Sequence, residues 1–187
     1  MIRKSKEYIR EKIHWVLGHV MGIISLILVV AVFGGAYFFI IAPSIASKPF
    51  IDYPFLPSDA LTDIKVGSSV INSSHINYVI TELGAYKLDK PIFTKDYPIM
   101  EFVLTDTGQM YYSYVDKHMP LTKKGNPKNP DISIKASQET IYNALKSDSV
   151  KDFVKKSVDD GTITVNLTAD MTTLTRKGYL SLYNTLI

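Results

Sequence analysis

The feature that most constrains this 187-residue sequence is an uncharged apolar stretch near its start. Residues 20–42 include fourteen Val, Ile, Leu or Phe and no formal charge. A helix rises about 1.5 Å per residue, so these residues would span about 35 Å, against a hydrocarbon core of about 30 Å. The sequence therefore predicts a transmembrane helix over residues 16–43, with a modest tilt.

Charge predicts how this helix is oriented. The first 12 residues hold five Lys or Arg and two Glu, whereas the rest of the chain holds 16 basic and 16 acidic residues. A basic flank before a first span predicts a cytoplasmic tail at residues 1–15, and a single-pass protein of the cell membrane with its C-terminal part extracytoplasmic. The neutral remainder argues against a nucleic-acid partner.

A cleaved signal peptide is the alternative interpretation of the same segment. Ser44 and Ala46 are small residues at a spacing that suits a signal peptidase. The apolar stretch is, however, longer than the roughly 7 to 15 residues usual in a signal peptide. We therefore favour an uncleaved signal anchor.

Reactive residue types are scarce. The chain has no cysteine, which excludes disulfides and thiolate chemistry. His14, His19, His75 and His118 do not follow the spacing of a metal site, and no nucleophile elbow, phosphate-binding loop or zinc-protease motif occurs. We expect no enzyme, no metal and no cofactor. An extracytoplasmic enzyme is a third alternative, but it would need a convergent set of polar groups that the sequence does not reveal.

Residues 44–68 predict a semi-extended connector. Prolines at high density prevent both helix and sheet. The aromatic residues between them are expected either to lie on the headgroup layer of the membrane or to pack against the folded domain. The prolines are Pro43, directly before the connector, and Pro49, Pro54 and Pro57 within it, and they are interleaved with Phe50, Ile51, Tyr53, Phe55 and Leu56.

Residues 69–187 predict one α+β domain, with a mostly antiparallel sheet and helices on one face. Helices are indicated by apolar residues at three-and-four spacing after capping serines or Asp170, and strands by alternation. The predicted order is a helix over 73–88, a hairpin of strands 99–104 and 110–115, a strand over 131–136, a helix over 138–146, a second helix from Ser149 to Gly161, a strand over 162–168 and a final helix.

The second half of this domain resembles the sterol carrier protein type 2 family. Pro130-Asp131-Ile132-Ser133-Ile134 leads through Ser137 into a helix with Glu139, and Gly161 precedes an alternating strand. Asp170-Met171 then opens the last helix, and the helix and hairpin over 73–116 also lie where the family has them. The sequence departs from the family at Ala169, where a Gly is frequent, and at Thr172-Thr173.

The resemblance implies a mixed sheet with helices over one face and an apolar tunnel that holds fatty acyl or sterol-like lipid. The last helix would act as a lid, and the bound partner would be a lipid or fatty acid. The same residues at helical spacing are also typical of ordinary core. The candidates for the cavity are Phe102, Leu104, Tyr112, Tyr114, Ile141, Leu145, Phe153, Met171, Leu174 and Leu182.

Two functions follow as hypotheses. The first is a membrane-anchored lipid-binding module that holds or presents an apolar ligand. The second is a non-catalytic accessory subunit of a larger membrane complex, for which Ala31 and Gly35 form a small-x-x-x-small pair that admits a partner helix. Asn72 and Asn166 lie in glycosylation sequons on the expected outer side.

Overall fold

A computed structural model describes residues 21, 23–33, 46–91 and 94–186 of the chain. The chain divides into two compact units, Met1–Ala42 and Pro43–Ile187. In the first unit, residues 23–33 are helical and their large apolar side chains are exposed.

No helix within the described residues is long and apolar enough to cross a membrane. Most of the predicted span over 16–43, including Gly35, lies outside those residues, as does the basic tail 1–15. The signal anchor therefore stays a prediction.

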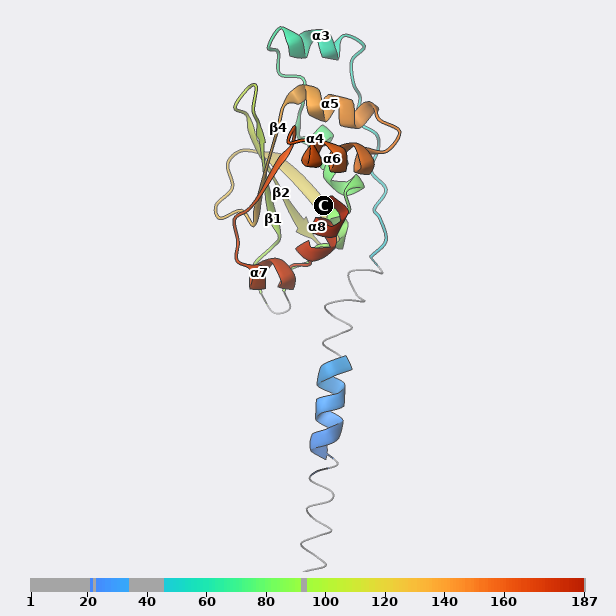
Figure 1. The fold of residues 1–187 in the computed structure, drawn as a ribbon, viewed down its shortest axis with the longest axis vertical. Coiled ribbons are helices and arrows are strands. Elements are labelled where there is room, and N and C mark those ends of the chain that lie inside the picture. Colours follow the sequence, from blue (N-terminus) through green and yellow to red (C-terminus); the bar gives the residue numbers. More distant parts are fainter. Residues whose placement is uncertain (1–20, 22, 34–45, 92–93, 187) are drawn as a thin grey trace, which may run out of the picture. The chain divides into compact units, whose positions relative to one another are not determined.

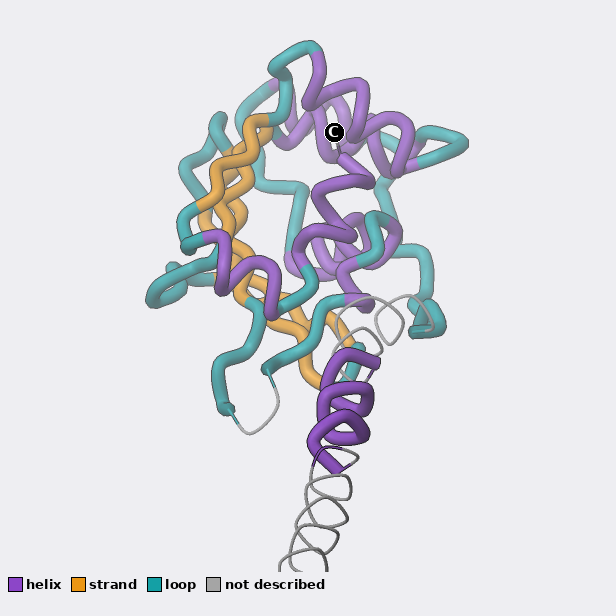
Figure 2. Tube along the Cα trace, turned by 60° about the horizontal axis from the view of Figure 1, so that its bottom comes forward, coloured by secondary structure: helices purple, strands orange, loops and turns teal. Residues whose placement is uncertain are grey.

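The second unit is a mixed α+β domain, as the sequence predicts, and it is built on a five-stranded sheet (Figure 1). The strand order is β3-β2-β1-β4-β5, and every neighbouring pair is antiparallel except β1 and β4. Helices gather on one side of the sheet (Figure 2). The strands are β1 Ile99–Leu104, β2 Met110–Asp116, β3 Met119–Lys124, β4 Ile132–Ala136 and β5 Thr164–Leu167.

Alternation along the strands decides which face the helices cover. In β1, Met100, Phe102 and Leu104 are buried, whereas the residues between them are half-buried. The register places Met100 opposite Ile132 and Phe102 opposite Ile134 of β4, so their side chains share one face. Because successive side chains of a strand point to opposite faces, this apolar set forms a continuous floor for the helices.

Capping residues fix the starts of the helices. Asn72 accepts hydrogen bonds from the N–H groups of Ser74 and His75, and Ser137, Ser149 and Asp170 accept from the backbone three residues on. These bonds satisfy N–H groups that the helix leaves without partners. The helices are α3 Ala60–Lys65, α4 Ser73–Glu82, the short 3-10 turn η2 Ala85–Lys87, α5 Gln138–Lys146, α6 Val150–Asp159, α7 Met171–Arg176 and α8 Tyr179–Leu186.

Several predicted boundaries are wrong. The helix predicted over 73–88 ends at Glu82, because Gly84 takes the left-handed conformation that terminates it. The sequence prediction also omitted β3, whose proline and two lysines are atypical of a strand, and it treated α3 as part of the connector. Proline is tolerated in β3 because that strand lies at an edge of the sheet.

The predicted final helix is two helices, broken at Gly178. This residue has a φ of +85°, which L side chains rarely adopt, and a Cβ there would lie 3.4 Å from the Lys87 carbonyl oxygen. The break turns α8 away from α7, and it brings the backbone of residue 178 against the segment that follows η2.

We expect Gly178→Ala to lower the free energy of unfolding by more than Gly161→Ala. Gly161 also has a positive φ, of +79°, but its added Cβ would meet no atom within 4 Å. Both variants carry the left-handed penalty of about 1–2 kcal/mol. Only in Gly178→Ala does the added Cβ also meet backbone, at the short end of van der Waals contact with the Lys87 carbonyl oxygen, which restricts how far residue 178 can relax. Urea denaturation of the two variants measures the difference. Equal decreases in the free energy of unfolding would contradict a close contact between residue 178 and the Lys87 carbonyl.

The connector is held to the domain at several points. The Lys48 Nζ lies 2.6 Å from Glu82 Oε1, and the Tyr53 hydroxyl donates to the Leu145 carbonyl at 2.9 Å. The side chains of Phe50 and Phe55 are instead 91% and 82% exposed. The connector therefore contacts the domain through Lys48 and Tyr53, whereas Phe50 and Phe55 face outward.

His75 ties the connector to the start of α4. Its Nδ1 accepts from the Asn72 N–H at 3.1 Å, and its Nε2 lies 3.0 Å from the Phe55 carbonyl oxygen. Only a neutral imidazole protonated at Nε2 serves both partners. Burial lowers the pKa of His75 from its ordinary value of 6.5, and the hydrogen bond with Phe55 opposes this in part.

This arrangement predicts a loss of stability in mild acid. Because the pKa of His75 is lower in the folded state, the unfolded chain binds more protons as the pH falls below about 6.5, and the free energy of unfolding falls with it, by at most about 1.4 kcal/mol per pH unit. His75→Gln should flatten this dependence between pH 7.5 and 5, measured by urea denaturation. His118→Gln serves as the control for removal of an imidazole elsewhere, and a slope that His75→Gln leaves unchanged would contradict the prediction.

Candidate apolar binding site

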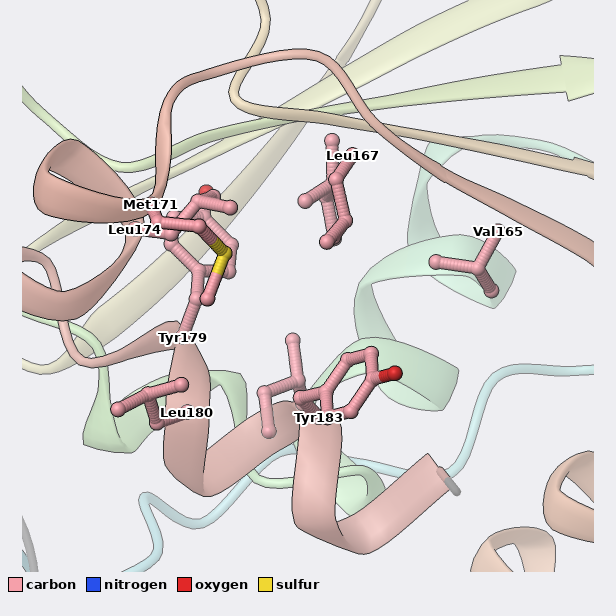
Figure 3. Close-up of a pocket in the computed structure, with 9 residues that line it drawn as sticks. Val165, Leu167, Met171, Leu174, Tyr179, Leu180 and Tyr183 are labelled. Carbon is pink, nitrogen blue, oxygen red and sulfur yellow. The ribbon is translucent and has the colours of Figure 1, made fainter.

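An open apolar pocket lies between the edge strand β5 and the two C-terminal helices. It encloses about 190 Å³. Figure 3 shows residues of α7 and α8 on one side and those of β5 across from them. Its lining residues are Ile132, Val165, Leu167, Met171, Leu174, Tyr179, Leu180, Leu182 and Tyr183.

The pocket exists because the sheet extends past its helical cover. Leu167 pairs with Ile132 and Val165 with Ile134, so both β5 side chains face the helices. Ile132 and Ile134 are buried, yet Leu167 remains exposed and Val165 half-buried. Two helix-facing apolar side chains at the sheet edge are thus left incompletely covered.

The helices supply a buried wall and an open rim. Leu174, Tyr179 and Leu182 are buried, and they form the inner wall. Met171 is 60% exposed, and Leu180 and Tyr183 are also exposed at the mouth. A ligand could therefore enter without unpacking the core.

Of the ten predicted cavity residues, the structure brings three to this pocket: Met171, Leu174 and Leu182. The others lie elsewhere. Tyr112 and Tyr114 are half-buried on the sheet face opposite the helices, since they alternate with the buried residues of β2. Four of the others, Phe102, Leu104, Ile141 and Leu145, are buried in the core, and Phe153 packs partly buried against it.

The ten cavity candidates did not include the remaining lining residues. The alternation over 162–168 correctly predicted a strand, and it would have indicated Val165 and Leu167 as one apolar face. What the alternation could not reveal is that β5 is an edge strand whose inner face is left partly open.

The volume restricts what the pocket holds. Small-molecule pockets commonly enclose about 300–1,000 Å³, while an engineered cavity of about 150 Å³ binds benzene. At about 190 Å³, the pocket accommodates a small apolar group or a short stretch of hydrocarbon chain. A larger ligand would extend through the open rim.

A buried ion pair fixes the position of the helices beside the pocket. Lys177, between α7 and α8, places its Nζ 2.8 Å and 3.1 Å from the two carboxylate oxygens of Asp131. The Lys177 and Asp131 side chains are only 3% and 4% exposed. Lys177 also donates to Asp96 Oδ1 at 2.7 Å and to the Tyr97 carbonyl at 3.0 Å, so its three protons face four acceptor atoms.

Asp131 also binds the pocket wall and the central strand. Its Oδ2 accepts from the Tyr179 hydroxyl at 3.1 Å and from the Ile99 N–H at 2.7 Å. Burial first, and then the Asp131 charge, raise the pKa of Tyr179 well above its usual 10, so this hydroxyl stays a donor. The polar cluster thus orients the Tyr179 ring as one wall of an otherwise apolar pocket.

We expect Asp131→Asn to lower the free energy of unfolding by about 3–5 kcal/mol, because it removes the charge that compensates a buried ammonium group. Asp96→Asn removes the other carboxylate bound to Lys177, but Asp96 is 51% exposed and should cost less than about 1 kcal/mol. Urea denaturation at pH 7 compares the two variants. Similar losses would contradict the central role of Asp131.

Both predicted glycosylation positions are exposed. Asn72 uses its side-chain oxygen to cap α4, and Asn166 lies on β5. Among the described residues, no group of three or more His, Asp or Glu side chains is placed to hold a metal ion.

No family model matches the chain, and none of the curated proteins matches it. Solved structures with a partial likeness include the inverting sec-alkylsulfatase Pisa1 from Pseudomonas sp., at 20% identity over 45% of this chain and 13% of that one, with a TM-score of 0.30. Its S233Y F250G double mutant matches at 17% identity over 70% and 16%, with a TM-score of 0.33.

A UbiJ-SCP2 ubiquinone synthesis protein is also a structural neighbour, at 10% identity over 67% of this chain and 96% of that one, with a TM-score of 0.35. This chain spans only 13–16% of the length of the alkylsulfatase structures. At these scores the likenesses establish neither a family nor an activity.

Proposed function

We propose that this protein is a non-enzymatic, membrane-anchored module that binds the hydrocarbon part of a lipid or fatty acid. The observation that carries the proposal is the open apolar pocket between β5 and the C-terminal helices. Burial of apolar surface would supply the binding free energy.

The lining favours a hydrocarbon chain over a charged or polar ligand. All nine lining residues are aliphatic, Met or Tyr, and the Tyr179 hydroxyl is already engaged by Asp131. A headgroup would have no ionic partner among these residues and would remain outside the rim. The exposed Met171 and Leu180 suit this boundary, because flexible apolar side chains adapt to ligands of varied shape.

The architecture supports the same proposal. A mixed, mostly antiparallel sheet with helices over one face is the arrangement that the sterol carrier protein resemblance implies, and the C-terminal helices, which line the pocket, would serve as its lid. The pocket is smaller than a tunnel for a whole sterol would be, so we propose that a single acyl chain enters by its end.

Membrane anchoring rests on the sequence. The uncharged residues 20–42 and the basic residues before them support a signal anchor with the N-terminus in the cytoplasm and the lipid-binding domain outside. A tether of this kind would keep the pocket close to membrane lipid, which suits presentation of a ligand better than transport through solution.

An accessory subunit of a membrane complex is the second candidate. It is favoured by the dense interior, because seven of the ten predicted cavity residues do not reach the pocket. In that role the domain would act as a scaffold and bind no lipid. Native mass spectrometry of residues 43–187, purified without detergent and followed by lipid extraction, separates the two candidates. Stoichiometric lipid supports the first, and a ligand-free folded domain contradicts it.

A rim substitution provides the sharper prediction. We expect Met171→Glu to weaken binding of the fluorescent fatty acid cis-parinaric acid by about tenfold or more, since a charge would be buried against the entering chain. The residue is exposed and begins a helix, where an acidic side chain is favourable, so the fold should persist. Val66→Glu is the matched control, because Val66 is 74% exposed and ends α3, which lies at the opposite end of the domain from α7 (Figure 1). Equal affinities would place the fatty acid elsewhere.

A further inference from the structure

We propose that the β3 edge of the sheet, together with Phe55 of the connector, binds the surface of an anionic lipid bilayer. We call this surface the β3 face, and it consists of Phe55, Met119, Leu121 and the lysines Lys117, Lys123, Lys124 and Lys128. It shares no residue with the apolar pocket, so its role does not depend on a ligand in that pocket.

The apolar part of the β3 face lies at the sheet edge. Met119 and Leu121 are both exposed, whereas Pro120 between them is fully buried. Leu121 pairs with Tyr114 and Met119 with Asp116, on the side of the sheet that the helices leave uncovered. The strand thus presents two large apolar side chains to solvent at a position where charged residues usually protect an edge.

Phe55 lies beside this strand. A groove of about 640 Å³ runs between residues 51–55, the start of α4 and β3, and both Phe55 and Leu121 line it. The Phe55 carbonyl oxygen lies 3.0 Å from His75 Nε2, and Phe55 as a residue is 82% exposed. An outward aromatic ring on an anchored backbone is a feature of surfaces that contact a partner.

The basic part of the β3 face lies along the same strand and in the segments before and after it. Lys123 pairs with Tyr112 and shares the face of Leu121, whereas Lys124 pairs with the buried Tyr111 and lies on the opposite face of the strand. Lys117, Lys123, Lys124 and Lys128 are all exposed, and within the described part of the chain none of them forms an ion pair. Lys123 Nζ instead lies 5.4 Å from the centre of the Tyr114 ring. The acidic neighbours of the β3 face include Asp116, at the end of β2, Asp52, which lines the groove, and Glu101, which pairs with Tyr112 on the face that Lys123 shares.

An anionic bilayer would bind both the lysines and the exposed apolar side chains of the β3 face. Lysines are attracted to acidic headgroups, and exposed Phe, Leu and Met side chains enter the boundary between headgroups and acyl chains. A nucleic acid would satisfy the lysines but not the exposed aliphatic side chains.

Fluorescence quenching in the full-length chain tests the proposal. With the single tryptophan removed by Trp15→Phe, reporters are placed by Leu121→Trp or Phe55→Trp, and by Val66→Trp as the control on another exposed apolar site. The chain is combined with vesicles of phosphatidylcholine, or of phosphatidylcholine with phosphatidylglycerol, that carry acyl-chain bromines. We expect quenching at 55 and 121 to exceed that at 66 by about twofold or more in the anionic vesicles, and to fall with salt.

Two double variants with the same change in net charge test whether the lysines of the β3 face cause the preference for anionic vesicles. Lys123→Glu with Lys124→Glu should abolish the difference between anionic and neutral vesicles, as measured with the reporter that Leu121→Trp introduces. Lys151→Glu with Lys156→Glu, on the exposed side of α6, makes the same change in net charge and should preserve that difference.

Three results would overturn the proposal: equal quenching at 66, 55 and 121, no dependence on anionic lipid, or failure of the chain to float with the vesicles. Binding of single-stranded RNA that survives Phe55→Ser and Leu121→Ser would assign the lysines to nucleic acid instead. The cis-parinaric acid measurement is made without vesicles, so failure of the β3 face and failure of the pocket are distinguishable.

Discussion

The ion pair between Lys177 and Asp131 is the interaction on which the C-terminal half of the domain depends. Desolvating two charges is costly, and the cost is offset here only because each charge has several hydrogen-bond partners. Asp131 receives hydrogen bonds from β1, from Tyr179 of α8 and from Lys177, and its backbone carbonyl accepts from Thr168 and Ala169 after β5. One residue thereby joins the central strand, the edge strand and the helices that form the pocket.

That interaction also accounts for a pocket that is open yet ordered. The inner wall is fixed because the Tyr179 hydroxyl donates to Asp131 and the backbone of the turn is hydrogen-bonded, with the Lys177 carbonyl accepting from the Asp89 N–H. At the rim, Met171 and Leu180 are exposed, and their apolar side chains have no group that could form a hydrogen bond of this kind. The site therefore combines a rigid base with side chains that can adjust to a ligand.

The sequence predicted the local structure better than the site. The bounds of β1 and α5 agree with the predictions, because alternation in one and a serine cap in the other are local signals. Lys177 was not predicted as buried, since a lysine near a helix end ordinarily lies in solvent. The pocket depends on which strand lies at the sheet edge, and strand order arises from long-range pairing that no local pattern specifies.

The separation of the paired charges along the chain has a consequence for synthesis. The cation that neutralises Asp131 lies 46 residues later, and 81 residues after Asp96. During translation, the meander of β1, β2 and β3 emerges first, and β4 then brings its carboxylate beside the central strand without a counter-charge. Contacts between distant residues form slowly, because a long loop must close first. The growing chain should therefore hold an unfinished, locally acidic sheet end until the ribosome has released Lys177.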